Sequence, residues 1–421
     1  MNAASRQVST RRVFHIPGYD PMPPRRYREL YRKEGAAQAA ISGYEIGVKA
    51  DKSDATFRWT VGARINGHAV MSQVDVLVWA DIVKGSMAQS IPATYAQLVQ
   101  TAWTYISTGT LRRLMWMRKG PVIAALYPVV MLLSQLSLAL IAGVLIGGWV
   151  TDLLINGLRL VGLSQGGVFD AVAHGLGWVC LIGVAVFALR WFKARDNKLF
   201  AYYLMHDYAY SARLRGEVPP ELDARMQAFE AIIAQALAED VDEVLIVGHS
   251  SGAHLAVSII ADLLRAGHVR ADGPKLAFLS LGQVVPMVSF LPRAQRLRRD
   301  LAFLSTRDEI TWVDVSAPGD GCCFALCDPV AVSGVGPDVQ RWPLVISAAF
   351  TQSLSPTRWK ALRWRFFRLH FQYLCAFDQP KDYDYFQITA GPVLLADRYA
   401  GRKPSGSRID VPVSKYTSVQ P

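Results

Sequence analysis

The pentapeptide Gly248-His249-Ser250-Ser251-Gly252 sets a serine hydroxyl between two glycines. A largely apolar run over 243–247 precedes it and is typical of a strand that is buried on both faces. A helical pattern over 253–266 follows it. The glycines leave room for a sharp reversal from strand to helix, so the spacing predicts that Ser250 is a nucleophile at the tip of a strained turn.

A second short segment, His15-Ile16-Pro17-Gly18, ends an early predicted strand in a Gly/Pro turn. Together with Gly-x-Ser-x-Gly at a strand–helix junction, it resembles the α/β-hydrolase superfamily, and more narrowly its lipase and esterase branches. The resemblance covers most of the chain outside 120–195 and the C-terminal tail. The serine turn is its specific part, and the remainder is order and spacing.

The resemblance implies the chain order serine, acid, histidine, so the general base must follow Ser250. Three histidines do so. His254 is on the helix after the serine turn, and His268 precedes the next two predicted strands, so only His370 lies late enough in the chain. We predict His370 as the base, and the alternative is a histidine on an amphipathic helix.

The acid of such a triad is expected in a loop that follows a strand between the serine and the histidine. The run 310–316 predicts the strand, and Ala317-Pro318-Gly319-Asp320-Gly321 predicts the loop. Asp320 is therefore the candidate, with the task of fixing the imidazole tautomer. An ordinary turn aspartate would suit the same loop, and Asp328 is the reserve acid.

Two backbone N–H groups are expected to stabilise the oxyanion of the tetrahedral intermediate. The resemblance assigns one to Ser251, directly after the nucleophile, and the other to the loop after the early strand. That loop makes Gly18 or Tyr19 the second donor, because Pro17 has no N–H group. The alternative for this loop is an ordinary turn. No metal or organic cofactor is required by this chemistry.

Five cysteines are too few and too scattered for a disulfide framework, and reduced thiols fit a cytosolic setting. Cys322, Cys323 and Cys327 are clustered, which raises the alternative of a metal site. A second pair of ligands at a familiar spacing is missing from the sequence. We therefore predict small buried thiols and no metal.

Two stretches are long and apolar enough to cross a bilayer. Hydrophobic residues make up 51% of the chain and charged residues only 19%, which is slightly apolar for a soluble enzyme. No charged residue occurs over 120–151, which exceeds the roughly 20 residues that a spanning helix needs. The stretch 171–189 has only His174 as a titratable group. We predict a transmembrane hairpin with spans at about 121–149 and 171–190; a buried core helix is the alternative for each.

Basic residues flank the hairpin on both outer sides: Arg112, Arg113, Arg118 and Lys119 before it, and Arg190, Lys193, Arg195 and Lys198 after it. The link over 152–170 has Arg159 as its only cation. The positive-inside rule then puts both termini and the hydrolase domain in the cytoplasm, of a bacterial inner membrane by expectation. The net charge of +11 is assigned to anionic lipid headgroups, because no nucleic-acid-binding module is recognisable.

The remaining patterns predict an α/β domain with a mainly parallel sheet flanked by helices, interrupted by the hairpin. Its strands are expected over 11–16, 45–48, 56–65, 74–79, 243–247, 275–281 and 310–316, and its helices over 27–40, 96–106, 220–237, 253–266 and 293–304. Asn66-Gly67 predicts a β-hairpin. The domain parts are 1–119 and 193–398, the hairpin is 120–192, and 399–421 is expected to be a loose polar tail.

These features together predict a membrane-anchored serine hydrolase that cleaves carboxylic esters, with lipids or lipid-derived esters as substrates. Its partners are then the bilayer and an acyl ester, and no nucleic acid. Two rivals stay open. One is a catalytically silent membrane scaffold that keeps the fold, and the other is a transporter component, which two spans without an intramembrane polar pair make a poor fit.

Overall fold

The computed structural model describes residues 7–51, 56–87, 89–162 and 167–420. The chain divides into two compact units. The first, called the sheet unit below, comprises Met1–Gly85, Trp103–Ile123 and Ser211–Pro421. The second, called the hairpin unit, comprises Ser86–Ala102 and Ala124–Tyr210. The sheet unit therefore contains most of the two chain segments that the sequence assigned to an α/β domain, whereas residues 86–102 and 193–210 of those segments belong to the hairpin unit.

The described strands form one eight-stranded sheet with the order β2-β3-β4-β1-β5-β6-β7-β8. Their bounds are β1 Thr10–Ile16, β2 Glu45–Ala50, β3 Phe57–Ile65, β4 His68–Val76, β5 Glu243–His249, β6 Lys275–Leu281, β7 Ile310–Ser316 and β8 Leu344–Ser347. From β4 through β8 neighbouring strands pair in parallel, and only β3 runs antiparallel to its neighbours β2 and β4. The predicted α/β class with a mainly parallel sheet is confirmed.

The predicted β-hairpin at Asn66-Gly67 joins β3 to β4, with Ile65 opposite His68. Asn66 and Gly67 have φ values of 51° and 80°, the left-handed conformation that a tight two-residue hairpin turn needs. Strand β4 begins at His68, well before the predicted start at residue 74. In its first half exposed and buried residues alternate, whereas its last residues are continuously buried. Only the continuously buried part was recognised as a strand from the sequence.

The described helices vary from single turns to 42 residues. Their bounds are α1 Arg25–Ser42, α2 Ala80–Met87, α3 Ile91–Ser107, α4 Thr110–Met117, α5 Lys119–Leu160, α6 Gly167–Ala194, α7 Asp196–Leu199, α8 Ala201–Ala212, α9 Pro220–Leu237, α10 Gly252–Arg265, α11 Val285–Ser289, α12 Gln295–Leu304, α13 Pro329–Val332, α14 Phe350–Ser353, α15 Pro356–Leu362, α16 Phe366–His370, the 3₁₀ helix η1 Gln372–Leu374, α17 Tyr385–Ala390 and α18 Leu395–Arg398.

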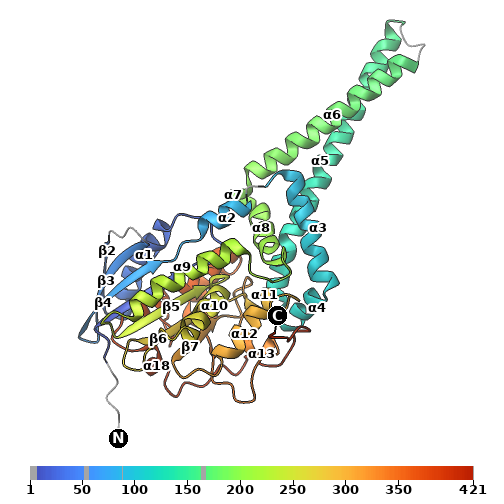
Figure 1. Ribbon diagram of the computed structural model, residues 1–421. Helices are drawn as coiled ribbons and strands as arrows, with labels where there is room; N and C mark the ends of the chain where they lie inside the picture. Colours follow the sequence, from blue (N-terminus) through green and yellow to red (C-terminus); the bar gives the residue numbers. More distant parts are fainter. Residues whose placement is uncertain (1–6, 52–55, 88, 163–166, 421) are drawn as a thin grey trace. The chain divides into compact units, whose positions relative to one another are not determined.

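Helices cover both faces of the sheet. On one face α10 packs against β5 between α9 and α12, and Figure 1 shows α9 and α10 lying over the strands. On the other face Tyr27 and Tyr31 of α1 belong to the same buried hydrophobic cluster as Val13 of β1 and as Leu245 and Val247 of β5. Residues of β5 therefore alternate between two apolar layers, as a central parallel strand requires.

Strands β1 and β5 are neighbours, and the chain leaves them toward opposite edges of the sheet. The next parallel strand after β1 is β4 on one side, and the next after β5 is β6 on the other. The loops at the carboxyl ends of β1 and β5 therefore diverge at a topological switch point, where open α/β sheets bind their ligands. Gly18 and Ser250 follow these two strand ends.

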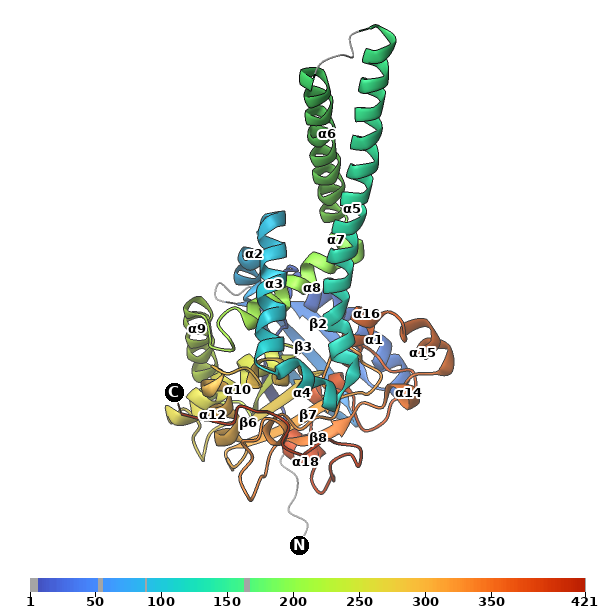
Figure 2. The same cartoon turned by 90° about the vertical axis from the view of Figure 1, so that its right-hand side faces the viewer.

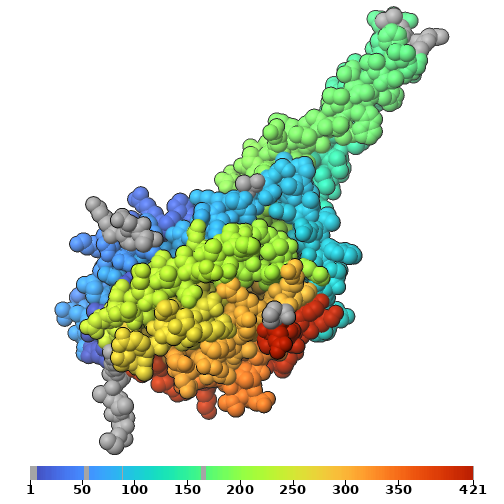
Figure 3. Space-filling view, viewed as in Figure 1, coloured from blue at the N-terminus to red at the C-terminus, as the bar shows by residue number. Residues whose placement is uncertain are grey.

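The expectation of a loose C-terminal tail is wrong. Ile409 donates its N–H to Leu326 O at 2.7 Å, and Asp328 donates its N–H to Ile409 O at 2.8 Å. Further along, the buried Arg298 donates from Nε to Ser418 O at 2.7 Å. Figure 3 shows the last residues, in red, lying against the surface of the sheet unit. This segment is held by hydrogen bonds to backbone groups. Such bonds do not require a periodic pattern of apolar residues, so the sequence carries no sign that the segment is ordered.

Two helices are long and apolar enough to span a membrane, Lys119–Leu160 and Gly167–Ala194. The hairpin unit contains all of the second and all of the first except its initial residues up to Ile123, which belong to the sheet unit. Only 22% and 17% of their most apolar windows are buried, unlike the core helix of a soluble protein. The helices extend into the expected link of 152–170, because Leu153, Leu154 and Ile155 continue a helical sequence. Four residues of the remaining link, 163–166, lie outside the described residues.

Helices α5 and α6 lie side by side (Figure 2) and approach each other at small residues. A Cβ atom on Gly147 would stand 2.6 Å from Gly177 O, and one on Gly143 would stand 2.7 Å from Leu181 O. A Cβ on Gly177 would stand 2.0 Å from Oγ1 of Thr151. This small-residue spacing is typical of helix pairs that pack within lipid.

Candidate active site

Ser250 has a φ of 56°, which is in the left-handed region that residues with a side chain seldom occupy. It stands directly between β5 and α10. Its N–H donates to Leu281 O at 2.9 Å, and its carbonyl accepts from Ala253 N–H at 3.1 Å. These bonds hold a conformation that costs on the order of 1–3 kcal/mol, and such strain collects at functional sites.

Both glycines of the pentapeptide are fixed by close backbone contacts. A Cβ on Gly252 would lie 2.0 Å from Ile16 O and 2.7 Å from Pro17 O, at the end of β1. A Cβ on Gly248 would lie 2.7 Å from the Cα of Ala253. The turn after β5 is therefore pressed against the turn after β1 and against its own helix, and glycine alone permits this approach.

The loop after β1 lies against the serine side chain. A Cβ on Gly18 would stand 2.9 Å from Cβ and 3.4 Å from Oγ of Ser250. Trp79 donates from Nε1 to Pro17 O at 2.9 Å, and its ring packs edge-on against the buried Tyr19. Ser251, also buried, is the residue that directly precedes α10. The residues predicted to supply oxyanion donors thus border Ser250 on both sides.

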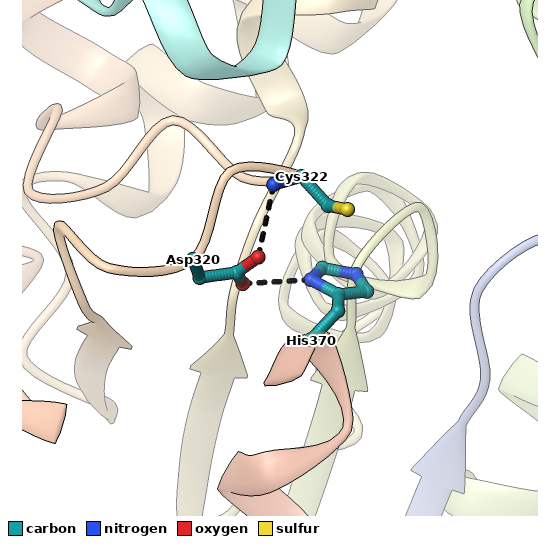
Figure 4. Close-up of side chains that lie close together, drawn as sticks. All are labelled: Asp320, Cys322 and His370. Atoms are coloured by element: carbon teal, nitrogen blue, oxygen red, sulfur yellow. Dashed lines mark hydrogen bonds and ion pairs between the residues drawn. The ribbon is translucent and has the colours of Figure 1, made fainter. Parts of the chain in front are cut away.

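Asp320 and His370 are hydrogen-bonded to each other. His370 Nδ1 and Asp320 Oδ2 lie 2.7 Å apart, and both side chains are buried (Figure 4). The second carboxylate oxygen accepts the N–H of Cys322 at 2.9 Å. Asp320 follows β7 and His370 ends α16, so residues that are 50 positions apart in sequence form one acid–imidazole pair. The two residues that the sequence proposed as acid and base are brought together.

The environment of Asp320 favours its charged form. Burial alone would raise the pKa of this carboxyl group, but the neighbouring His370 and the N–H of Cys322 outweigh burial and lower the pKa below its usual range. Tyr373 donates its hydroxyl to Asp320 Oδ2 at 3.1 Å. Burial, and then the Asp320 charge, raise the pKa of Tyr373 well above its usual value, so the phenol keeps its proton as a donor. A persistent carboxylate is what a triad acid requires.

The imidazole of His370 packs against both chain segments that hold Ser250. The backbone carbonyl oxygen of His370 lies 3.0 Å from Nε2 of His249, the residue before Ser250, and the two rings have centroids 4.8 Å apart. The Cε1 of His370 would lie 3.2 Å from a Cβ on Gly282, the residue after the partner of Ser250 N–H. Within the described residues no hydrogen bond joins Ser250 Oγ to His370. In unliganded enzymes such bonds are often long and tighten when substrate binds.

The reserve acid, Asp328, has a different role. Its Oδ1 accepts the N–H groups of Val330 and Ala331, which caps the N-terminus of α13. Its Oδ2 accepts from Gln340 Nε2 at 2.7 Å. These contacts engage both carboxylate oxygens in local structure, so Asp320 is the aspartate that His370 contacts.

The sequence did not identify three residues around the pair: His249, Tyr373 and Cys322. The His249 side chain contacts the backbone carbonyl of His370. Burial lowers the pKa of His249 well below its usual value, so a neutral ring donates its Nε2 proton to the His370 carbonyl. Tyr373 could have been suspected from its position three residues after His370, because side chains at this spacing on a helical turn are neighbours.

The strain at Ser250 gives a test that is independent of catalysis. Replacement of Ser250 by glycine should make the protein about 1 kcal/mol more stable than replacement by alanine, because glycine accepts a positive φ without a Cβ penalty. Both variants lack the hydroxyl, so the difference reports the backbone alone. Thermal unfolding of the two variants in the same lipid or detergent would measure it. Equal stabilities would show that the turn is unstrained.

No family model matches the chain, and comparisons with curated proteins and with solved structures return no match. Function must therefore be inferred from the geometry of the residues around Ser250.

Proposed function

We propose that this protein is a membrane-anchored serine hydrolase of the α/β-hydrolase type that cleaves carboxylic esters, with lipids or lipid-derived esters as substrates. The observation that carries the proposal is the left-handed conformation of Ser250 at the β5–α10 junction. A serine at this position is costly in conformational energy, and the use of this partly exposed side chain as a nucleophile would explain the cost. The Asp320–His370 pair beside the same turn supplies the base that a serine needs.

The proposed reaction proceeds through an acyl-enzyme. Ser250 Oγ attacks the ester carbonyl while Nε2 of His370 takes the hydroxyl proton and then delivers it to the leaving alcohol. Asp320 accepts the Nδ1 proton in a hydrogen bond, which keeps Nε2 open as the base. Water repeats the sequence on the acyl-enzyme and releases the acid. No metal ion or organic cofactor takes part in these steps.

The oxyanion is proposed to be stabilised by backbone N–H groups on the two sides of Ser250. Ser251 lies at the N-terminus of a 14-residue helix, where unpaired N–H groups and the helix dipole favour a negative charge. Gly18 or Tyr19 would supply the second donor, and the contact of Gly18 with Ser250 supports this. The contact also explains the glycine, because a side chain at position 18 would collide with the nucleophile.

Exposed aromatic and basic residues support a lipid substrate, and one of them contacts the loop 317–321 that carries Asp320, called the acid loop below. Trp364 and Trp116 are 73% and 61% exposed, and arginine guanidinium groups lie over both rings. Phe366, also exposed, contacts Gly321 of the acid loop, where a Cβ would stand 3.4 Å from its ring. Aromatic rings with adjacent arginines are typical of surfaces at the level of lipid headgroups.

The acid loop also contacts the start of the first candidate membrane helix. A Cβ on Gly120, the second residue of α5, would stand 3.3 Å from the Cα of Gly321. Arg118 donates from Nε to Ala325 O at 2.8 Å. The segment that carries Asp320 is thus bonded to the segment that leads into α5, which supports access to amphipathic substrates from the bilayer.

The proposal is tested by covalent labelling of the full chain in lipid nanodiscs with a fluorophosphonate probe. The expected result is one labelled peptide with the adduct on Ser250 and none on the adjacent Ser251. Heat-denatured protein is the control, because an unactivated serine does not react. Absence of an adduct from the native chain would favour the rival function, a silent membrane scaffold that keeps the fold.

Substrate class is tested separately with the labelled site known. The rates of hydrolysis of a lipid ester within the nanodisc and of a short soluble ester with the same type of ester bond are compared at equal protein concentration. Faster turnover of the lipid ester is expected, and equal or faster turnover of the soluble ester would overturn the lipid assignment while leaving the hydrolase intact.

A further inference from the structure

The acid–base pair has a thiol beside it that the hydrolytic reaction does not use. A carboxylate oxygen of Asp320, a ring nitrogen of His370 and Sγ of Cys322 all lie within 4.8 Å of one another. Figure 4 shows the Cys322 sulfur on the side of the imidazole away from Asp320. Cys322 is partly exposed, whereas Asp320 and His370 are buried, so the thiol is the part of the cluster that solutes reach.

The three side chains are the ligand types that zinc prefers. Thiolate, imidazole and carboxylate all bind Zn²⁺, with bond lengths of about 2.0–2.3 Å, so two ligand atoms on one tetrahedral ion stand about 3.3–3.8 Å apart. The cluster is therefore within about 1 Å of that spacing. Rotation of the partly exposed Cys322 side chain can provide this adjustment, because its sulfur is at the end of a single rotatable bond.

The hydrogen bond between Asp320 and His370 prepares the imidazole for a metal. His370 directs Nδ1 to Asp320, which leaves the lone pair of Nε2 for another partner. A carboxylate on the far nitrogen is the usual support of a zinc-bound histidine, because it fixes the tautomer and raises the basicity of the ligating nitrogen. The same arrangement that makes His370 a base thus makes it a zinc ligand.

We propose that Cys322 and His370 form an inhibitory site for a soft divalent cation, with Zn²⁺ as the fitting ion. The Cys322 thiol releases its proton to solvent on binding, and the ion occupies the Nε2 lone pair that Ser250 needs. Asp320 holds the imidazole or completes the ligand set. The inhibitory role depends on the proposed hydrolase, whereas the binding of the ion does not.

Binding is tested with Co²⁺, a coloured substitute for Zn²⁺, added to the full chain in nanodiscs. A thiolate-to-cobalt charge-transfer band in the near ultraviolet is expected for the wild type. It should be lost in Cys322→Ser and Cys322→Ala and kept in the control Cys375→Ser, another partly exposed thiol. Persistence of the band in both Cys322 variants, or its absence from the wild type, would overturn the site even if Ser250 proves not to react.

Inhibition is tested by titration of ester hydrolysis and of fluorophosphonate labelling with Zn²⁺ and Mg²⁺. Each rate is expressed relative to the metal-free rate of the same variant. The Zn²⁺ concentration for half inhibition should rise at least tenfold in Cys322→Ser and stay unchanged in Cys375→Ser, while Mg²⁺ has no effect because it prefers oxygen ligands. Equal Zn²⁺ sensitivity of the two variants, or equal inhibition by Mg²⁺, would overturn the inhibitory role.

Discussion

Replacement of Ser250 by alanine is expected to lower kcat for ester hydrolysis by about 10⁶-fold, the scale of loss when a triad nucleophile is removed. The reason is that the acyl-enzyme can no longer form, and His370 then has no hydroxyl to activate. The alanine keeps the Cβ and the positive φ of residue 250, so the turn and its contact with Gly18 are retained. Loss of activity would then report the hydroxyl and not the fold.

This expectation is checked by the steady-state rate on an ester substrate in nanodiscs, with thermal unfolding as evidence of folding. Ser407→Ala is the matched control, because Ser407 is exposed and its contact with Arg118 uses its backbone carbonyl, which the substitution keeps. The control should keep the wild-type rate. A Ser250→Ala protein with more than one hundredth of wild-type activity would assign the chemistry to another nucleophile.

The bounds of strands were predicted best where the sequence is continuously apolar, and a short strand was missed. Strands β6 and β7 have the bounds expected from their apolar runs, 275–281 and 310–316. Strand β8 was not predicted, because Leu344–Ser347 is only four residues long and the single-turn helix α13 that precedes it is too short to give a helical pattern in the sequence. Burial on both faces produces a sequence signal, and a short edge strand produces almost none.

The residues of the candidate site and their order along the chain could be predicted, but the residues that contact them could not. Ser250, Asp320 and His370 were selected from turn chemistry and chain order, and these features are local or follow from the resemblance. The contact of His249 with the His370 carbonyl depends on how α16 packs against the end of β5, which no spacing encodes. The closeness of Cys322 to His370 likewise arises only when two loops meet in the folded chain.

The two candidate membrane helices also show that composition can be read from the sequence whereas contacts cannot. Their length and apolar character were evident from 120–151 and 171–189, and the structure contains both helices. The interhelical approach at Gly147 and Gly177 was not predicted, although both residues are glycines within apolar segments. Glycine spacing becomes informative only when the facing helix is known, because the motif is defined by a pair of surfaces.

Replacement of Asp320 by asparagine is expected to lower kcat by about 10⁴-fold with little change of structure. Asparagine keeps an acceptor for the N–H of Cys322, but its amide can hold His370 in the wrong tautomer, with the proton on Nε2. It also removes the charge that steadies the imidazolium in the transition state. The loss should fall on kcat more than on KM, because the carboxylate contacts His370 and not the substrate.

Asp328→Asn is the matched control, because its Oδ1 can still cap α13 and both oxygens of Asp328 are engaged away from His370. It should keep activity near that of the wild type; a larger loss in this variant than in Asp320→Asn would exchange the roles of the two aspartates.

The pH dependence of stability provides a second measurement of the role of Asp320. Because the folded-state pKa of Asp320 is lowered, its carboxylate contributes to stability above the ordinary pKa of about 4, and this contribution is lost as the pH falls through the lowered value. The unfolding free energy of Asp320→Asn should therefore change less across the acid range than that of the wild type, which acid titration of the two proteins would measure.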